Sequence, residues 1–205
     1  MYNLSPSELN LSADLLQGHY RSLYVTAPSE GAGSSSCAYA LALALRELVN
    51  EPVLLIDGNF ENPGLNNQFN LNEWSGFADW LRSDDQDPSD YICKVKNHEI
   101  HVMGTGQVAA EHPLRGLAEQ IPERVKLLLE VYPYIVLDAP AINQSGSLNL
   151  AALFNGVILV AAENQTRIES LETAKQQLQQ AGANLVGSIL NRRRQYIPNW
   201  LSKLV

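Results

Sequence analysis

The chain has few of the residues that mark several common protein classes. It contains only two cysteines, Cys37 and Cys93, which are too few for a disulfide framework or a zinc site, so we expect both to be small buried side chains. No apolar run reaches the roughly 18 residues needed to cross a bilayer, and the first residues lack a basic-then-apolar export signal. These absences predict a cytoplasmic protein.

Positive charge is also scarce. Lysine and arginine total 14 against 22 acidic residues, which gives a formal net charge of −8. Such a balance repels the phosphate backbone and argues against a general nucleic-acid binder. What the chain does have is 205 residues, of which 45% are hydrophobic, enough for one globular domain with a full core.

Apolar runs of strand length alternate with segments of helical period. This order predicts an α/β fold, a doubly wound and mostly parallel sheet with helices on both faces. The expected strands are 23–27, 53–57, 100–104, 135–138, 157–161 and 185–190, and the expected helices lie near 35–49, 114–131, 148–154 and 168–181. The first helix is apolar nearly all round, so it should be sandwiched against the sheet. We divide the chain into an N-terminal extension (1–21), a main domain (22–191) and a basic tail (192–205).

The first expected strand runs into a glycine-rich loop and then into a helix. This is the layout of a phosphate-binding P-loop, in which backbone N–H groups and the positive end of a helix surround phosphate oxygens. The residues predicted to line it are Gly31, Ala32, Gly33, Ser34, Ser35 and Ser36. Ser34 stands where a P-loop has its lysine. A string of glycine and serine taken alone also fits an ordinary loop.

Two expected strands end in an aspartate, Asp57 and Asp138. Because the carboxyl ends of parallel strands form the ligand crevice of an open sheet, both carboxylates should lie beside the glycine loop. One of them could merely cap a helix. Two of them, together with the loop, fit a nucleotide site in which carboxylates hold Mg²⁺ directly or through water.

The order of these motifs resembles the bacterial tyrosine kinases of the CpsD/CapB type. The resemblance rests on the glycine loop, on Leu54-Leu55-Ile56-Asp57 followed by Asn62-Pro63-Gly64-Leu65, on Tyr134 to Pro140, and on Gly182 to Arg192. It implies a P-loop fold related to the MinD and ParA ATPases. It further implies ATP and Mg²⁺ as ligands, Ser35, Asp57 and Asp138 as metal ligands, and Asn191 at the position that reads adenine. The partner it implies is a membrane polysaccharide co-polymerase that regulates capsular or extracellular polysaccharide.

The chain departs from that family at its charged positions. Ser34 replaces the loop lysine, and Asn59 and Glu61 replace the second aspartate and the arginine of Asp-x-Asp-x-Arg. Only Tyr196 remains of the terminal tyrosine cluster, and no ring-forming Glu-x-x-Arg-x-x-Arg helix precedes Tyr24. Losing one cation that meets developing phosphoryl charge costs on the order of 3–4 kcal/mol. We therefore predict a pseudokinase that binds ATP weakly.

Two other functions stay open. A weakly active autokinase would need a substitute cation, and Arg167, Lys175 or the Arg192-Arg193-Arg194 run could supply one, although surface solvation is the plainer interpretation of each. A MinD- or ParA-like positioning ATPase would carry a further lysine where Ser29 stands. Asn191 fits a turn as well as a base contact. Trp74 and Trp80 should pack against other residues and not bind a ligand. The basic tail could touch anionic lipid or the co-polymerase and so recruit the protein to the inner membrane, or fold back on the domain; a homodimer is expected at most.

Overall fold

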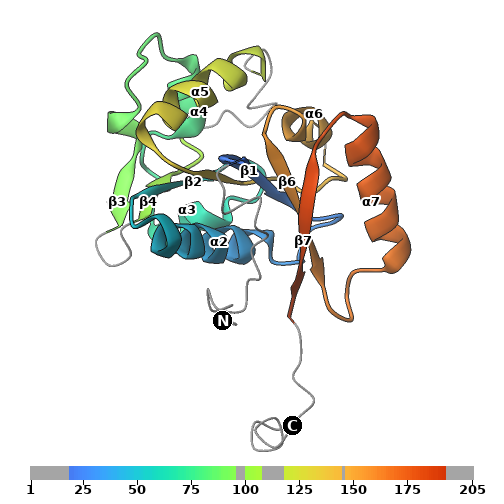
Figure 1. Ribbon diagram of the computed structural model, residues 1–205. Coiled ribbons are helices and arrows are strands. Elements are labelled where there is room, and N and C mark those ends of the chain that lie inside the picture. The colour runs from blue at the N-terminus through green and yellow to red at the C-terminus, as the bar shows by residue number, and fades with distance from the viewer. Residues whose placement is uncertain (1–18, 96–99, 108–117, 145, 193–205) are drawn as a thin grey trace, which may run out of the picture.

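A seven-stranded sheet forms the centre of the molecule (Figure 1). The computed structural model describes residues 19–95, 100–107, 118–144 and 146–192. The strands are β1 (Ser22–Thr26), β2 (Val53–Asp57), β3 (Cys93–Val95), β4 (Ile100–Met103), β5 (Ile135–Asp138), β6 (Gly156–Ala162) and β7 (Leu185–Asn191). The helices are α2 (Ser34–Val49), α3 (Gly64–Phe69), α4 (Phe77–Arg82), α5 (Ile121–Val131), α6 (Ser147–Ala151) and α7 (Ile168–Gln180). The predicted doubly wound α/β fold is confirmed.

The strand order β3-β4-β2-β5-β1-β6-β7 places the two predicted aspartates side by side. Every pairing is parallel except that of β3 with β4. Asp57 at the end of β2 is the register partner of Asp138 at the end of β5, and Asp138 is in turn the partner of Val25 on β1. The carboxyl ends of β1, β2 and β5 therefore meet at one place, directly where the glycine loop leaves β1.

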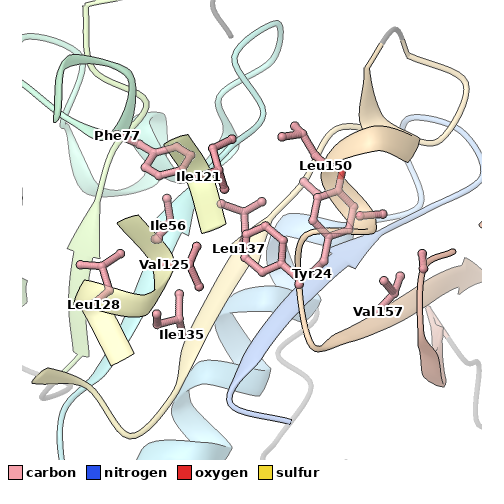
Figure 2. Packing of buried hydrophobic residues seen from close by; sticks show 14 of the residues in the cluster. Tyr24, Ile56, Phe77, Ile121, Val125, Leu128, Ile135, Leu137, Leu150 and Val157 are labelled. Carbon is pink, nitrogen blue, oxygen red and sulfur yellow. The ribbon is translucent and has the colours of Figure 1, made fainter. Parts of the chain in front are cut away.

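Two apolar layers hold the sheet, one on each face. One buried cluster joins the sheet to α4, α5, α6 and α7, with Phe77, Leu128, Leu150 and Leu178 among its members. Figure 2 shows part of this cluster, with Ile121, Val125 and Leu128 of α5 facing Ile56, Ile135 and Leu137 of the strands. The other cluster lies under α2, which buries seven of its residues. These buried positions confirm that the first helix packs against the sheet, while Leu48 near its end is 48% exposed.

Three elements were absent from the sequence prediction. The strand β3 and the short helices α3 and α4 have three or six residues each, too few to display a hydrophobic period. The helix predicted over 114–131 begins only at Ile121, after a 3₁₀ turn at Ala118–Gln120, because Pro122 fits the first helical turn and not a helix interior. Residues 114–117 lie outside the described part of the chain.

The structure also shows where one further helix ends and how deeply the tryptophans and cysteines are buried. The helix predicted over 148–154 ends at Ala151. Trp80 is fully buried, which agrees with a packing role, whereas 52% of the surface of Trp74 is exposed. Cys37 is buried and Cys93 is half-buried. Within the described ranges, none of the helices combines the length and the apolar character that crossing a bilayer requires. Nearly all of the N-terminal extension and of the basic tail, Tyr196 included, lies outside the described residues.

Candidate functional site

The glycine loop has the backbone conformation of a phosphate-binding loop. Gly31 and Gly33 both take a φ of 83°, in the left-handed region that favours glycine. Helix α2 starts immediately afterwards at Ser34, and its Cys37 N–H donates to Gly33 O at 3.1 Å. No side chain caps this helix. Its first-turn N–H groups and the positive end of its dipole are therefore left for water or an anion.

Asn191, at the end of the edge strand β7, bonds to the glycine loop. Its Nδ2 atom, at the end of β7, donates to Ala32 O at 2.8 Å, and its Oδ1 atom accepts from Arg192 N at 2.8 Å. A Cβ atom on Gly33 would lie 2.3 Å from that Nδ2 atom, so the close approach requires glycine. The predicted adenine contact of Asn191 stays a prediction. Both ends of its amide already have partners within the chain.

Asp57 is buried and fully engaged with backbone donors. Its Oδ1 atom accepts from Asn59 N at 3.1 Å, and its Oδ2 atom accepts from Leu65 N and Asn66 N at 2.9 Å each. These bonds cap the start of α3. Burial raises the Asp57 pKa to about 6, against the opposing effect of the three N–H groups. The helix-cap role left open by the sequence is thus found at Asp57.

Asp138 is equally buried but has no such partners. Neither of its carboxylate oxygens is within normal hydrogen-bond geometry of a donor. Burial, and then the neighbouring charge of Asp57, raise its pKa well above the ordinary value, while the nearby Ser35 hydroxyl lowers it only as the smallest of three influences. We therefore treat the carboxylate as unpartnered. A buried carboxyl group without partners is costly, which is characteristic of a site kept for function.

Asp138 faces the start of α2. Burial and, after it, the Asp138 charge raise the pKa of the Cys37 thiol to about 12, and Ser35 acts on Asp138 from the same helical turn. Ser35 also lies against α3, because a Cβ on Gly64 would come within 2.7 Å of its Oγ atom. A hydroxyl and a carboxylate without partners are oxygen donors of the kind that Mg²⁺ prefers. Three or more His, Cys, Asp or Glu side chains that could hold a metal alone occur nowhere in the described ranges, so Mg²⁺ would need phosphate oxygens as well.

The loop that follows β5 is held by a buried polar network. Thr26 Oγ1 and Ser147 Oγ both donate to Pro140 O, at 2.7 and 3.0 Å. Tyr24 Oη donates to Ser147 O at 2.9 Å. Burial raises the pKa of the Tyr24 phenol, which remains a neutral donor. The network fixes the chain directly after Asp138, which explains how the carboxyl group is kept in place.

Three side chains at the mouth of the site were missed as a group by the sequence analysis. Gln144 Nε2 donates to Glu30 Oε1 at 2.7 Å and to Glu61 Oε2 at 3.0 Å. Glu30 directly precedes Gly31 in the glycine loop, called the phosphate loop from here on, and Glu61 lies in the loop after β2. Both side chains are exposed. Only Glu61 was singled out from the sequence. Nothing in a linear pattern brings position 144 to positions 30 and 61.

The remaining degenerate positions have local roles. Asn59 is buried, and its Oδ1 atom accepts from Asn62 N at 3.2 Å within the turn after β2. Ser34 is the first residue of α2. Of the suggested substitute cations, Arg192 donates to Gln165, while Arg167 and Lys175 belong to the start and the body of the exposed α7 surface. Arg193 and Arg194 lie outside the described residues.

Carboxyl groups surround the glycine loop on two sides. Asp57 and Asp138 lie behind the loop, and Glu30 and Glu61 lie at its mouth. The three candidate cations that the structure describes have no hydrogen bond with the loop. A triphosphate would add several negative charges to this set, and like charges a few ångströms apart repel.

Comparison with known proteins agrees with this geometry. A family profile described as "Cellulose biosynthesis protein BcsQ" matches residues 21–190. The tyrosine-protein kinase CpsD of Streptococcus agalactiae serotype III is 27% identical over 172 residues, covering 83% of this chain and 73% of its own. CapB of Staphylococcus aureus, described as a putative tyrosine-protein kinase, is 24% identical over 185 residues, 89% of this chain and 80% of its own. The resemblance to CpsD/CapB proteins is thereby confirmed.

Solved structures share the fold. The kinase domain of VpsO superposes with a TM-score of 0.78 at 26% identity, covering 87% of each chain. The kinase domain of Escherichia coli ETK gives a TM-score of 0.78 at 20% identity, over 90% of this chain and 72% of its own. MinD from Pyrococcus horikoshii, solved with Mg-ADP, gives 0.69 at 23% identity, over 89% and 76%. The last two likenesses concern the fold alone.

Proposed function

Because the chain belongs to the cellulose biosynthesis protein BcsQ family, we propose that it is a catalytically degenerate, tyrosine-kinase-like P-loop protein of extracellular polysaccharide synthesis and export. It acts at the inner membrane surface with a membrane polysaccharide co-polymerase. Its contribution is the shape of the loops at the carboxyl edge of the sheet and not phosphoryl transfer. Homology to the CpsD and VpsO kinases supports the pathway.

The observation that carries the proposal is the distribution of charge around the loop. Where the related kinases have a lysine and an arginine, this chain has Ser34 and Glu61, and Glu30 adds another carboxylate. Phosphoryl transfer depends on preorganised positive groups that meet the developing charge. In their place the site has carboxylates at its mouth and behind its loop.

The decisive experiment is a calorimetric titration of the full chain with ATP and Mg²⁺, combined with an assay of autophosphorylation. The wild-type protein should show no saturable binding at micromolar ATP. A variant that restores the kinase motif, Ser34→Lys with Asn59→Asp and Glu61→Arg, should bind. The matched control is Gln176→Lys, which adds one positive charge at an exposed position of α7 and should not bind ATP. Micromolar binding together with autophosphorylation by the wild-type protein would overturn the proposal.

A weakly active autokinase is the second candidate, favoured by one observation. The Asp138 carboxylate is buried, has no partner in normal hydrogen-bond geometry and lies close to the Ser35 hydroxyl. These two oxygen-bearing side chains are the ones that would hold Mg²⁺ in an active enzyme. Such an enzyme would need a cation from a partner protein or from the tail. Equal ATP affinity of the wild-type protein and the Ser34→Lys variant would favour the weakly active autokinase over the pseudokinase. A positioning ATPase of the MinD or ParA kind is the third candidate.

A further inference from the structure

Gln144 uses its whole amide to join three loops. Its Oε1 atom accepts from Ala141 N at 3.0 Å, within its own turn after β5. Its Nε2 atom has two hydrogens, and these reach Glu30 Oε1 in the phosphate loop and Glu61 Oε2 in the loop after β2. The contacts span 114 and 83 positions of sequence.

The bonds also fix which way the amide points. A flipped amide would turn its oxygen toward two carboxylates and its N–H groups toward the Ala141 N–H, so only one orientation satisfies all three partners. Hydrogen bonds to a carboxylate are stronger than those between neutral groups. The turn itself is closed by Gln144 N, which donates to Ala141 O at 2.9 Å. This turn therefore fixes the backbone from which the Gln144 side chain extends.

The amide is neutral, and this matters for what the loops can bind. One nitrogen holds two carboxylates near each other without cancelling either charge. A lysine or arginine in the same place would hold the loops as well, but it would also attract phosphate. The glutamine keeps the loops together and leaves the mouth of the site negative.

In nucleotide-driven P-loop proteins the terminal phosphate and its metal ion order the surrounding loops, which loosen when the phosphate leaves. We propose that Gln144 is a positioning residue that replaces this part of the nucleotide's role, holding the phosphate loop and the loop after β2 in one arrangement without a ligand. The inference deepens the proposed function and rests on it, since it takes the edge formed by these loops to be the surface that a partner meets. Asn191 supplies a second, independent hold on the same loop at Ala32.

The test is limited proteolysis of the nucleotide-free full chain with an endoproteinase that cleaves after glutamate. Cleavage after Glu30 and after Glu61 is followed by mass spectrometry, and cleavage after Glu73, exposed in a separate loop, is the internal reference. In the Gln144→Ala variant the rates at Glu30 and Glu61 should rise about fivefold relative to Glu73, because both tethers are lost together. The thermal midpoint should change little, since no core contact is removed.

Two variants complete the experiment. Gln176→Ala removes an exposed glutamine from α7 and should leave all three rates unchanged. Gln144→Lys supplies an ammonium group that can donate to both carboxylates, and it should bring the two rates back to the wild-type values or below. Unchanged rates in Gln144→Ala, or a Gln144→Lys variant as exposed as the alanine variant, would overturn the positioning role. Because no nucleotide is present, the outcome is separate from that of the ATP titration.

Discussion

Asp57 and Asp138 occupy equivalent positions on neighbouring strands, yet their side chains meet opposite surroundings. Asp57 accepts three backbone N–H groups, whereas Asp138 has no hydrogen-bond partner. The difference arises because α3 begins beside Asp57, while Asp138 faces the open start of α2. The Asp57 carboxylate stabilises the start of α3. Burial of the Asp138 carboxylate, in contrast, lowers the stability of the folded protein.

The same substitution should therefore have opposite effects at the two positions. Asp138→Asn removes a carboxyl group whose charged form is disfavoured by burial and by Asp57, and it should raise stability at pH 7 by about 1 kcal/mol, or about 2–4 °C in the midpoint. Asp57→Asn turns an N–H group toward backbone donors and should lower stability by about 1–3 kcal/mol. Thermal unfolding of the two variants beside the wild-type protein measures both. Changes of the same sign would contradict the assignment.

The pH dependence of stability follows from the same carboxyl groups. Each holds its proton more tightly in the folded protein, Asp57 with a pKa of about 6 against 3.8 for the free group. Between these values the folded state binds more protons, so the contribution of Asp57 to stability falls as the pH rises through that window. It is constant above about pH 6.

Urea unfolding at several pH values between 4 and 7 checks this expectation. The advantage of Asp138→Asn over the wild-type protein should shrink as the pH is lowered, because the wild-type carboxyl group becomes neutral too. Asp84→Asn serves as a control, since that carboxyl group is exposed in the loop that follows α4. An advantage that grows at lower pH would show that the carboxyl group is charged and stabilised in the folded protein.

At the scale of elements, the phosphate loop is shaped by two long-range holds. Asn191 of β7 bonds the backbone at Ala32, and Gln144 of the loop after β5 bonds Glu30. The two residues come from strands on different sides of β1 in the sheet. Both contacts join the loop to segments that are distant from it in the sequence.

The two loop glycines should differ in their response to alanine. Both have a φ of 83°, so each substitution carries about 1–2 kcal/mol of backbone strain. A Cβ on Gly31 meets nothing within 4 Å, whereas one on Gly33 collides with the Asn191 amide. Gly33→Ala should therefore lower the free energy of unfolding more than Gly31→Ala does.

A second substitution isolates the close approach. In an Asn191→Ala background the extra cost of Gly33→Ala over Gly31→Ala should largely disappear, because the clashing amide is gone. Chemical denaturation of the single and double variants gives the coupling free energy. A coupling near zero would mean that the loop and β7 move apart without cost.

At the scale of the whole molecule, one apolar layer lies on each face of the sheet. Leu128 and Leu41, one on each side of the sheet, are both fully buried. The edge formed by the carboxyl ends of β1, β2 and β5 carries the acidic side chains of the candidate site. We therefore expect the apolar layers, and not a nucleotide at that edge, to set the stability of the wild-type protein.

Addition of Mg-ATP should leave the thermal midpoint of the wild-type protein within about 1 °C. A ligand at one hundred times its dissociation constant stabilises the folded state by about 2.7 kcal/mol, equivalent to about 5–10 °C for a chain of this size. Differential scanning fluorimetry at millimolar Mg-ATP distinguishes the two cases. The variant with the restored kinase motif is the positive control.

The amino-acid sequence by itself determined the alternation of strands and helices, the glycine loop and the two strand-ending aspartates. Local hydrophobic periods and turn residues specify such features, and parallel strands bring their carboxyl ends to one edge. The short elements β3, α3 and α4 carry too few residues for that signal. Helix α5 starts at Ile121 because Pro122 fits the first turn of a helix and not its interior. The hydrophobic period alone does not indicate this boundary.

Only the tertiary structure decided how each polar group is used. Whether an aspartate caps a helix or stays unpartnered depends on which backbone N–H groups reach it, as Asp57 and Asp138 show. The meeting of Gln144 with Glu30 and Glu61 depends on loops that follow three different strands. Such contacts are set by strand order and register over a hundred positions of sequence, and these are properties of the assembled sheet.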